Sequence, residues 1–294
     1  MTPAFDRFVA PARKRPQLWR LVAGLVLAIA IYVLWTVVVI VGAWFLFGRD
    51  TDPLLWAQAL VEADTPEGTL ILLATFLGMA LGPMAAARLL HGRRAGTLFG
   101  PRVRTLRDFA IAAGIVFAVL GTALLLWAVE YDAVVNLPLS IWAMVLPLTL
   151  LGLLVQTGAE EVLFRGYMQS QLAARFRSPL VWLVVPSLLF GIVHFDAVTA
   201  GDNVWMVVGS ASVFGLIAAD LTARTGSIGA AWGFHFANNV MAIAVISTDG
   251  TITGLARWVT PYTLAEYDAS APAILLDVAM LVVAWWLVRR AVAR

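Results

Sequence analysis

Two adjacent glutamates lie at the end of a long apolar stretch of this chain. Glu160 and Glu161 follow the uncharged segment 133–159, and Arg165 comes four residues after Glu161. A carboxylate at the centre of a bilayer costs about 2.5–3.5 kcal/mol on insertion scales, so ionisable groups at membrane depth usually mark a functional site. Carboxylates are also among the groups that proteins use for general acid–base catalysis. The two glutamates are therefore the first candidates for chemistry.

Two of the three histidines lie in other apolar stretches. Three pairs of polar or aromatic residues in this region are each four residues apart and so share one face of a helix: Glu161 with Arg165, Phe190 with His194, and His235 with Asn239. A polar face on an apolar membrane helix turns toward the protein interior rather than toward lipid. We therefore expect these faces to meet.

Spacing along the chain supports a meeting at one depth. Glu160 and His194 each lie 17 residues from Arg177, so an antiparallel helical hairpin turning there places both side chains at one height. At 1.5 Å per residue, that height is roughly 25 Å from the turn. His235 lies eight residues, about 12 Å, beyond Ser227, where another apolar stretch begins. The three groups can converge on one site.

Each residue also has a structural interpretation, and the sequence leaves both open. Glu161 and Arg165 can form an ion pair that tightens the bundle, while Glu160 can be a protonated, hydrogen-bonded carboxyl group. Histidine and asparagine side chains in membrane helices commonly bridge neighbouring helices. Outside this group, His91 lies in a basic connection and is expected to be solvated or at headgroup level. Asp220, four residues before Arg224, is expected to form a local pair with it.

The elements that hold these residues are predicted to be transmembrane helices. The chain is 61% hydrophobic and only 13% charged, and a helix needs about 20 apolar residues to cross a bilayer. Eight stretches approach that length: 21–47, 69–87, 109–129, 133–159, 178–195, 203–219, 225–248 and 269–288. The predicted fold class is all-α, a polytopic membrane protein with about eight transmembrane helices.

Charge asymmetry predicts the orientation. Basic residues gather in segment 1–20, in connection 93–107, at Arg175, Arg177 and Arg224, and at the C-terminal end 289–294, whereas the alternate connections are acidic. By the positive-inside rule the basic connections and both termini are cytoplasmic. We expect a cytoplasmic basic segment over 1–20 and one helical membrane domain over 21–294, in the cell membrane. The chain has no cysteine and no nucleic-acid-binding signature.

Together, these residues resemble the motifs of a known protease family. Glu160-Glu161-x-x-x-Arg165, Phe190-x-x-x-His194 and His235-x-x-x-Asn239, in this order, are similar to the three motifs of the CAAX prenyl protease and bacteriocin-processing (CPBP) intramembrane proteases, which include the Ras-converting endoprotease. The resemblance covers Gly158–Asn239 and implies a catalytic core over about 138–246.

The resemblance implies hydrolysis of a peptide bond in a membrane-associated protein or peptide. By analogy, Glu160, helped by His194, activates a water, His235 and Asn239 stabilise the oxyanion, and Glu161, Arg165 and Phe190 support them. A divalent metal such as zinc stays open, with Glu160, His194 and His235 as candidate ligands. The alternatives are a non-catalytic membrane scaffold or partner-binding protein, and a proton-coupled transporter. Whether the substrate is prenylated cannot be read from the chain.

Overall fold

The computed structural model describes residues 1–127, 133–267 and 271–292, without the side chains of 59, 61, 127 and 271–277. Its α-helices are α1 (Pro3–Val9), α2 (Leu18–Ala43), α3 (Pro53–Glu62), α4 (Pro66–His91), α5 (Arg102–Trp127), α6 (Leu139–Glu161), α7 (Ser170–Arg175), α8 (Pro179–Ile192), α9 (Ala197–Ala200), α10 (Val204–Thr225), α11 (Gly229–Asn239) and α12 (Ala271–Ala291). Short 3-10 turns are η1 (Ala10–Lys14), η3 (Ala95–Leu98) and η5 (Gly201–Asn203). π-Helical segments are η2 (Trp44–Gly48), η4 (Val162–Gln169) and η6 (Val240–Val245).

Long apolar helices dominate the molecule. Within the described residues, five segments are long and apolar enough to cross a membrane: Leu18–Gly48, Pro66–His91, Arg102–Leu126, Leu139–Arg175 and Ala197–Thr225. The shorter apolar helix α8 (Pro179–Ile192) accompanies them. The predicted class, a mostly helical polytopic membrane protein, is confirmed. The start of the predicted stretch 269–288 and the end of 109–129 lie outside the described residues.

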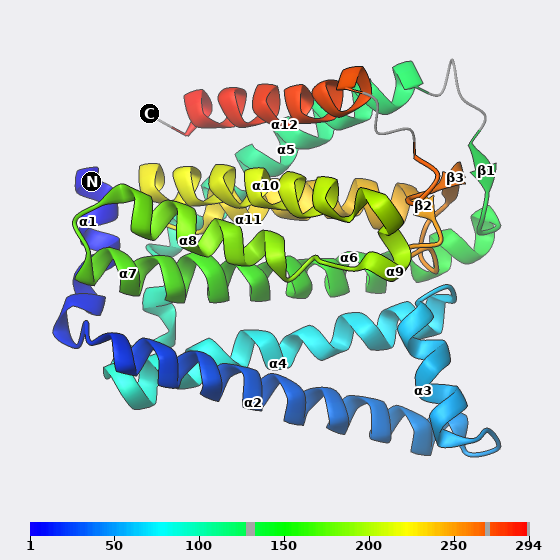
Figure 1. Ribbon diagram of the computed structural model, residues 1–294, viewed down its shortest axis with the longest axis horizontal. Helices are drawn as coiled ribbons and strands as arrows, with labels where there is room; N and C mark the ends of the chain where they lie inside the picture. The colour runs from blue at the N-terminus through cyan, green and yellow to red at the C-terminus, as the bar shows by residue number, and fades with distance from the viewer. Residues whose placement is uncertain (128–132, 268–270, 293–294) are drawn as a thin grey trace.

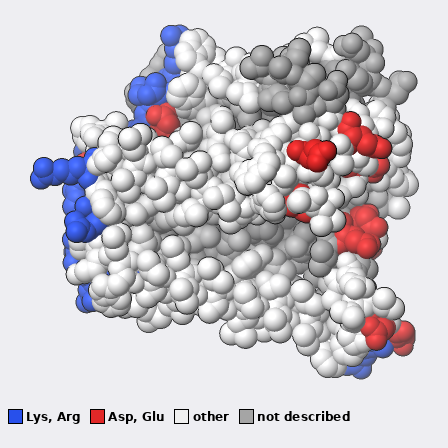
Figure 2. All heavy atoms as spheres, viewed as in Figure 1, with Lys and Arg blue, Asp and Glu red and all other residues white. Residues whose placement is uncertain are grey.

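The helices run roughly side by side in three groups (Figure 1). α2 and α4 pair at one side, α6, α8, α10 and α11 fill the middle, and α5 and α12 lie at the opposite side. Lys and Arg gather at one end of the visible face, while most Asp and Glu lie at the other (Figure 2). This separation follows the alternation of basic and acidic connections in the sequence.

A small β-sheet at the acidic end was not predicted. β1 (Val134–Val135), β3 (Trp258–Thr263) and β2 (Ile246–Asp249) form a three-stranded sheet in the order β1-β3-β2. β1 pairs with β3 antiparallel, and β2 pairs with β3 parallel. The all-α prediction is therefore corrected, since strands of two to six residues are too short to give a clear alternating pattern.

Two glycines bring α11 directly onto α5. Gly229 and Gly233 lie four residues apart, and a Cβ on either would collide with the backbone oxygen of Thr105 or Phe109 on α5. Small residues at this spacing let helix backbones approach closely in membranes. Because His235 is two residues after Gly233, this contact sets the depth at which its imidazole lies.

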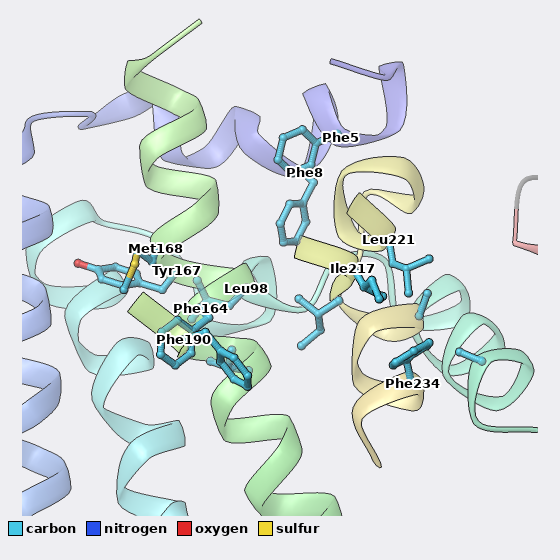
Figure 3. Packing of buried hydrophobic residues seen from close by; sticks show 14 of the residues in the cluster. Phe5, Phe8, Leu98, Phe164, Tyr167, Met168, Phe190, Ile217, Leu221 and Phe234 are labelled. Atoms are coloured by element: carbon cyan, nitrogen blue, oxygen red, sulfur yellow. The ribbon is translucent and has the colours of Figure 1, made fainter. Parts of the chain in front are cut away.

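The main hydrophobic core surrounds these central helices. Figure 3 shows the rings of Phe164 and Phe190 lying together on one side of the core and Phe234 beside α10 on the other. The Phe164 and Phe190 ring centroids are 5.1 Å apart in an edge-to-face arrangement. α1 closes the basic end of this core, where the buried Phe5 ring lies 5.1 Å from that of Trp182. The basic segment 1–20 thus packs on the bundle.

Two expectations about charged residues are wrong. His91 is buried rather than solvated, with Nε2 at 2.9 Å from the Tyr167 hydroxyl and Nδ1 donating to the Arg15 carbonyl at 3.0 Å. Asp220 pairs with Arg289 of α12 at 3.0 Å rather than with Arg224. In both cases the side chain pairs with a residue that is distant in sequence. The spacing of residues along one helix cannot reveal such a partner.

Candidate active site

Glu160 and Glu161 lie at the end of α6, inside the bundle. Both side chains are almost completely buried. Glu160 Oε1 accepts a hydrogen bond of 2.6 Å from Gln156 Nε2, one helical turn earlier. Its other oxygen, Oε2, is buried and has no hydrogen-bond partner among the described residues. A buried polar atom left in this way calls for a functional explanation.

Glu161 joins an arginine and a histidine from different parts of the chain. Its Oε1 accepts from Arg165 Nη1 at 3.0 Å and lies 2.9 Å from His235 Nδ1. The expected ion pair between Glu161 and Arg165 is therefore present. Arg165 also donates to the Gly215 carbonyl of α10 at 3.2 Å, and its guanidinium lies 4.7 Å from the centre of the Phe190 ring. Glu161 thus ties α6, η4, α10 and α11 together.

His235 faces both glutamates. Because a carboxylate can only accept at Glu161, Nδ1 of His235 carries a proton, and this leaves Nε2 directed at Glu160, 3.7 Å from Oε2. That separation is too long for a direct hydrogen bond and suits a contact through one intervening atom. The imidazole packs edge-to-face against the rings of Phe214 and Phe190, whose centroids lie 4.8 and 5.8 Å from its own.

The cluster brings two carboxyl groups, a guanidinium and an imidazole together in a buried site. Uncompensated buried charge is strongly unfavourable. The contacts of Glu161 with Arg165 and His235 therefore keep this carboxylate paired inside the bundle.

Asn239 reaches the same cluster through Gln156. Its Nδ2 donates to Gln156 Oε1 at 3.0 Å, and the Gln156 amide in turn donates to Glu160. The polar chain therefore runs from Asn239 through Gln156 to Glu160. Sequence reasoning missed Gln156, although its position four residues before Glu160 on the same helix face was a usable signal.

His194 lies at the edge of this cluster. It follows the last turn of α8, and its Nδ1 donates to the Phe190 carbonyl at 2.7 Å. The Phe190 ring contacts the rings of both His194 and His235. Between His194 and Glu160, no direct hydrogen bond occurs in the part of the chain that the structure describes. The side chain of His194 is exposed, whereas that of His235 is buried.

A π-helix follows each of two candidate motifs. η4 begins directly after Glu161, and η6 begins directly after Asn239. π-Helical turns are rare and concentrate at functional sites, because the wider turn redirects the side chains around it. Across η4, Arg165 still reaches back to Glu161. The π-helical turns and the polar cluster therefore coincide in the chain.

The candidate metal ligands do not converge as a set. Among the described residues, no group of three or more His, Cys, Asp or Glu side chains is placed to hold a metal ion. Glu160 and His235 face one another, whereas His194 is exposed and contacts the Phe190 ring. The proposed ligand trio Glu160, His194 and His235 does not fit a closed metal site in this arrangement, so no chemical step below depends on a metal.

The fold and the cluster together define a multi-pass helical membrane protein with a buried acid–base site. Comparison with known families agrees: residues 140–241 match the Type II CAAX prenyl endopeptidase Rce1-like family. The matched segment runs from α6 to η6 and contains every residue of the cluster described above.

A curated bacterial protein is similar to part of this chain. The chain is 30% identical over 115 residues to the uncharacterized protein YyaK of Bacillus subtilis (strain 168). The aligned segment makes up 39% of this chain and 38% of that protein. The chain thus spans under half the length of this relative. No solved structure matches the chain significantly.

Proposed function

We propose that this chain is an intramembrane endopeptidase that hydrolyses a peptide bond of a membrane-associated protein or peptide. One observation carries the proposal: the free Glu160 Oε2 lies 3.7 Å from His235 Nε2, while Glu161 holds the opposite edge of the imidazole. The pair offers a base and a donor side by side, and the protease family of residues 140–241 supports this reading.

Hydrolysis would begin with Glu160 as general base. Its Oε2 accepts a proton from a water molecule as the water oxygen attacks the carbonyl carbon of the substrate, and the carbonyl π electrons move to oxygen. When the tetrahedral intermediate collapses, the C–N bond breaks and Glu160 returns the proton to the leaving amine. The carboxylate thus ends as it began, and one water is consumed.

The oxyanion would be stabilised by His235. When the imidazole is protonated, Nε2–H points toward the free side of Glu160, where negative charge develops on the substrate oxygen. Asn239 is proposed as the second donor, released from Gln156 when substrate enters. His194 is proposed to assist Glu160 from the edge of the site, through the Nε2 that its bond to Phe190 leaves free.

Glu161, Arg165 and Phe190 are proposed as positioning residues. Glu161 holds His235 in one tautomer, and Arg165 holds Glu161 while lying against Phe190. A histidine oriented by a carboxylate on its second nitrogen is a recurrent way to fix its tautomer and ring direction.

The site is proposed to lie in the cell membrane, below its cytoplasmic surface. The five long segments, with α8, α11 continued by η6, and α12, would make eight crossings. Thr2 and Ala4 of the N-terminal segment lie in one cavity with Val292, just after α12, so both chain ends are near each other at the basic end. By the positive-inside rule that end is cytoplasmic.

The proposed substrate class is a peptide presented at the membrane, in the manner of CAAX processing. The test uses the full-length protein in proteoliposomes with a farnesylated CAAX peptide, and mass spectrometry identifies the products. We expect Glu160→Gln to lower the cleavage rate by about 10²–10⁴-fold, the usual contribution of a positioned general base. The matched control is Glu67→Gln, which removes the charge of an exposed glutamate at the acidic end.

If the prenylated peptide is not cut, the peptidome of membranes from cells expressing wild-type protein and Glu160→Gln widens the search. Peptides that depend on Glu160 would identify another substrate and support the endopeptidase. An identical peptidome for the two proteins, with both folded and inserted, would contradict it and favour a non-catalytic membrane scaffold.

A further inference from the structure

Two cavities lie along one face of α5 at the basic end. Arg104, Arg107 and Asp108 of α5 line the first, and Ile115 and Val119 line the second. At 3.6 residues per turn, these five positions share one side of the helix, with the two groups roughly 10 Å apart along its axis. One continuous face therefore changes from charged to apolar with depth.

The first cavity is rich in arginine. It has a volume of about 310 Å³ and is lined by Arg104, Arg107 and Arg224, with Asp108 as the opposing charge. Asp108 pairs with Arg107 at 2.7 Å, and Arg104 donates to the Thr225 carbonyl at 2.9 Å. Arg224 Nε is buried and makes no hydrogen bond within the described residues. The cavity thus keeps an excess of positive charge and an unused donor.

The second cavity is apolar except at one point. It measures about 420 Å³ and lies between α5 and α12, lined by Ile115, Ala118, Val119, Leu287, Ala291 and, as its one charged residue, Arg290. The Arg290 guanidinium lies 3.9 Å from the centre of the Trp286 ring. Tryptophan and arginine at a helix end mark the headgroup level of a membrane. The cleft therefore extends from that level toward the hydrocarbon.

We propose that these cavities form a binding site for an anionic phospholipid. The phosphate group would lie among Arg104, Arg107 and Arg224, and an acyl chain would lie in the α5–α12 cleft beside Arg290. Basic cavities between transmembrane helices on the cytoplasmic side bind anionic lipid headgroups. An amphiphile matches the order of charged and apolar surface along α5, whereas a free anion would use only the first cavity.

General surface charge is the competing explanation, because the positive-inside rule alone places arginines at this end. Arg94 and Arg102 provide the contrast. Both are exposed at the same end of the protein, and neither lines the first or the second cavity. If general surface charge attracts the lipid, all these arginines contribute equally to binding. If the lipid binds in the first cavity, Arg107 and Arg224 contribute, and Arg94 and Arg102 do not.

The test measures lipid binding to the purified full-length protein in phosphatidylcholine nanodiscs with and without phosphatidylglycerol, followed by native mass spectrometry. An arginine that contacts the bound headgroup is expected to contribute about 1 kcal/mol, or about fivefold in affinity. We therefore expect Arg107→Gln/Arg224→Gln to lose roughly twentyfold in phosphatidylglycerol affinity, and Arg94→Gln/Arg102→Gln to bind like wild type. Ala118→Phe, which fills the apolar cleft, should also weaken binding while leaving every arginine in place.

Three outcomes would overturn the proposal: equal losses in both arginine pairs, equal binding of phosphatidylcholine, or displacement of the lipid by inorganic phosphate, which would make the site one for a free anion. Thermal unfolding and gel filtration verify that each variant is folded. If the arginine pair does not fold, Ala118→Phe and the phosphate competition still decide the question.

Discussion

Glu161 Oε1 lies 2.9 Å from His235 Nδ1 and 3.0 Å from Arg165 Nη1, so a single carboxylate oxygen serves both partners. The arginine cancels the charge that Glu161 would otherwise bring into a buried site. The histidine gains a fixed tautomer and orientation. Both glutamates keep a second oxygen that is buried without a hydrogen-bond partner among the described residues, but only that of Glu160 faces His235 Nε2, at 3.7 Å. We therefore propose Glu161 as the positioning group of the cluster and Glu160 as the reactive one.

Removing the charge of Glu161 should slow the reaction without loosening substrate binding. In Glu161→Gln the side chain keeps its shape, but His235 Nδ1 loses the carboxylate that fixes its tautomer and orientation. Loss of such supporting partners typically costs about 10–100-fold in activity. We expect kcat for the cleaved peptide to fall by this amount with KM unchanged. A rise in KM with constant kcat would instead place Glu161 in substrate binding.

Gln156 should matter although it belongs to none of the motifs that the sequence suggested. In Gln156→Met the volume is kept, but the bonds to Glu160 and Asn239 are lost. Since displacements of about 1 Å at a reacting group can cost 10²-fold, we expect kcat to fall by roughly one to two orders of magnitude.

The matched control for this substitution is Gln171→Met. Gln171 is equally buried, yet neither atom of its amide has a hydrogen-bond partner among the described residues. It should retain full activity and equal or higher thermal stability, because an unpaired buried amide is removed. Equal activity losses in Gln156→Met and Gln171→Met would contradict a specific role for Gln156.

The sequence was sufficient to predict the class of the fold and much of the cluster. Apolar length identified the long helices, because hydrocarbon thickness sets a length that few soluble segments reach. The four-residue spacing correctly paired Glu161 with Arg165, since i,i+4 neighbours meet on a helix. The number of residues between each polar group and the nearest helix end predicted that His235 lies at the same depth as the two glutamates. The structure places His235 in contact with both.

Contacts between distant segments could not be predicted in the same way. Helix spacing says which residues share a face, but not which rings pack against one another across helices. The contact of the Phe190 ring with both His194 and His235 was therefore not foreseen. The bond of His91 to Tyr167 was missed for the same reason. The strands of the small sheet at the acidic end are too short to show the alternation of polar and apolar residues that predicts a strand.

The approach of α11 to α5 should depend on Gly233. A methyl group there would collide with the Phe109 carbonyl, a backbone atom that cannot rotate away. Overpacking of this kind costs about 1–3 kcal/mol. We expect Gly233→Ala to lower the thermal midpoint and, by shifting His235, the cleavage rate. Gly121→Ala on α5 is the control, because its Cβ would meet nothing within 4 Å, and it should be neutral or stabilising.

The buried contact between Tyr167 and His91 should contribute to stability. Tyr167→Phe leaves His91 Nε2 buried without its 2.9 Å partner. An unsatisfied buried group costs about 1–3 kcal/mol, so the thermal midpoint should fall. Tyr32→Phe, which removes a hydroxyl that makes no hydrogen bond in the described residues, should change little. Equal midpoints for the two variants would show that the His91 contact contributes nothing measurable.

The most direct test of the account is a double-mutant cycle between Glu160 and His235, read as kcat/KM for the peptide that the wild-type protein cleaves. If both side chains act on the same water and the same carbonyl, their losses are not additive. We predict that kcat/KM of the double variant Glu160→Gln/His235→Gln is no lower than that of the less active single variant. Losses that multiply would show that the two groups act independently and would contradict the proposed catalytic pair.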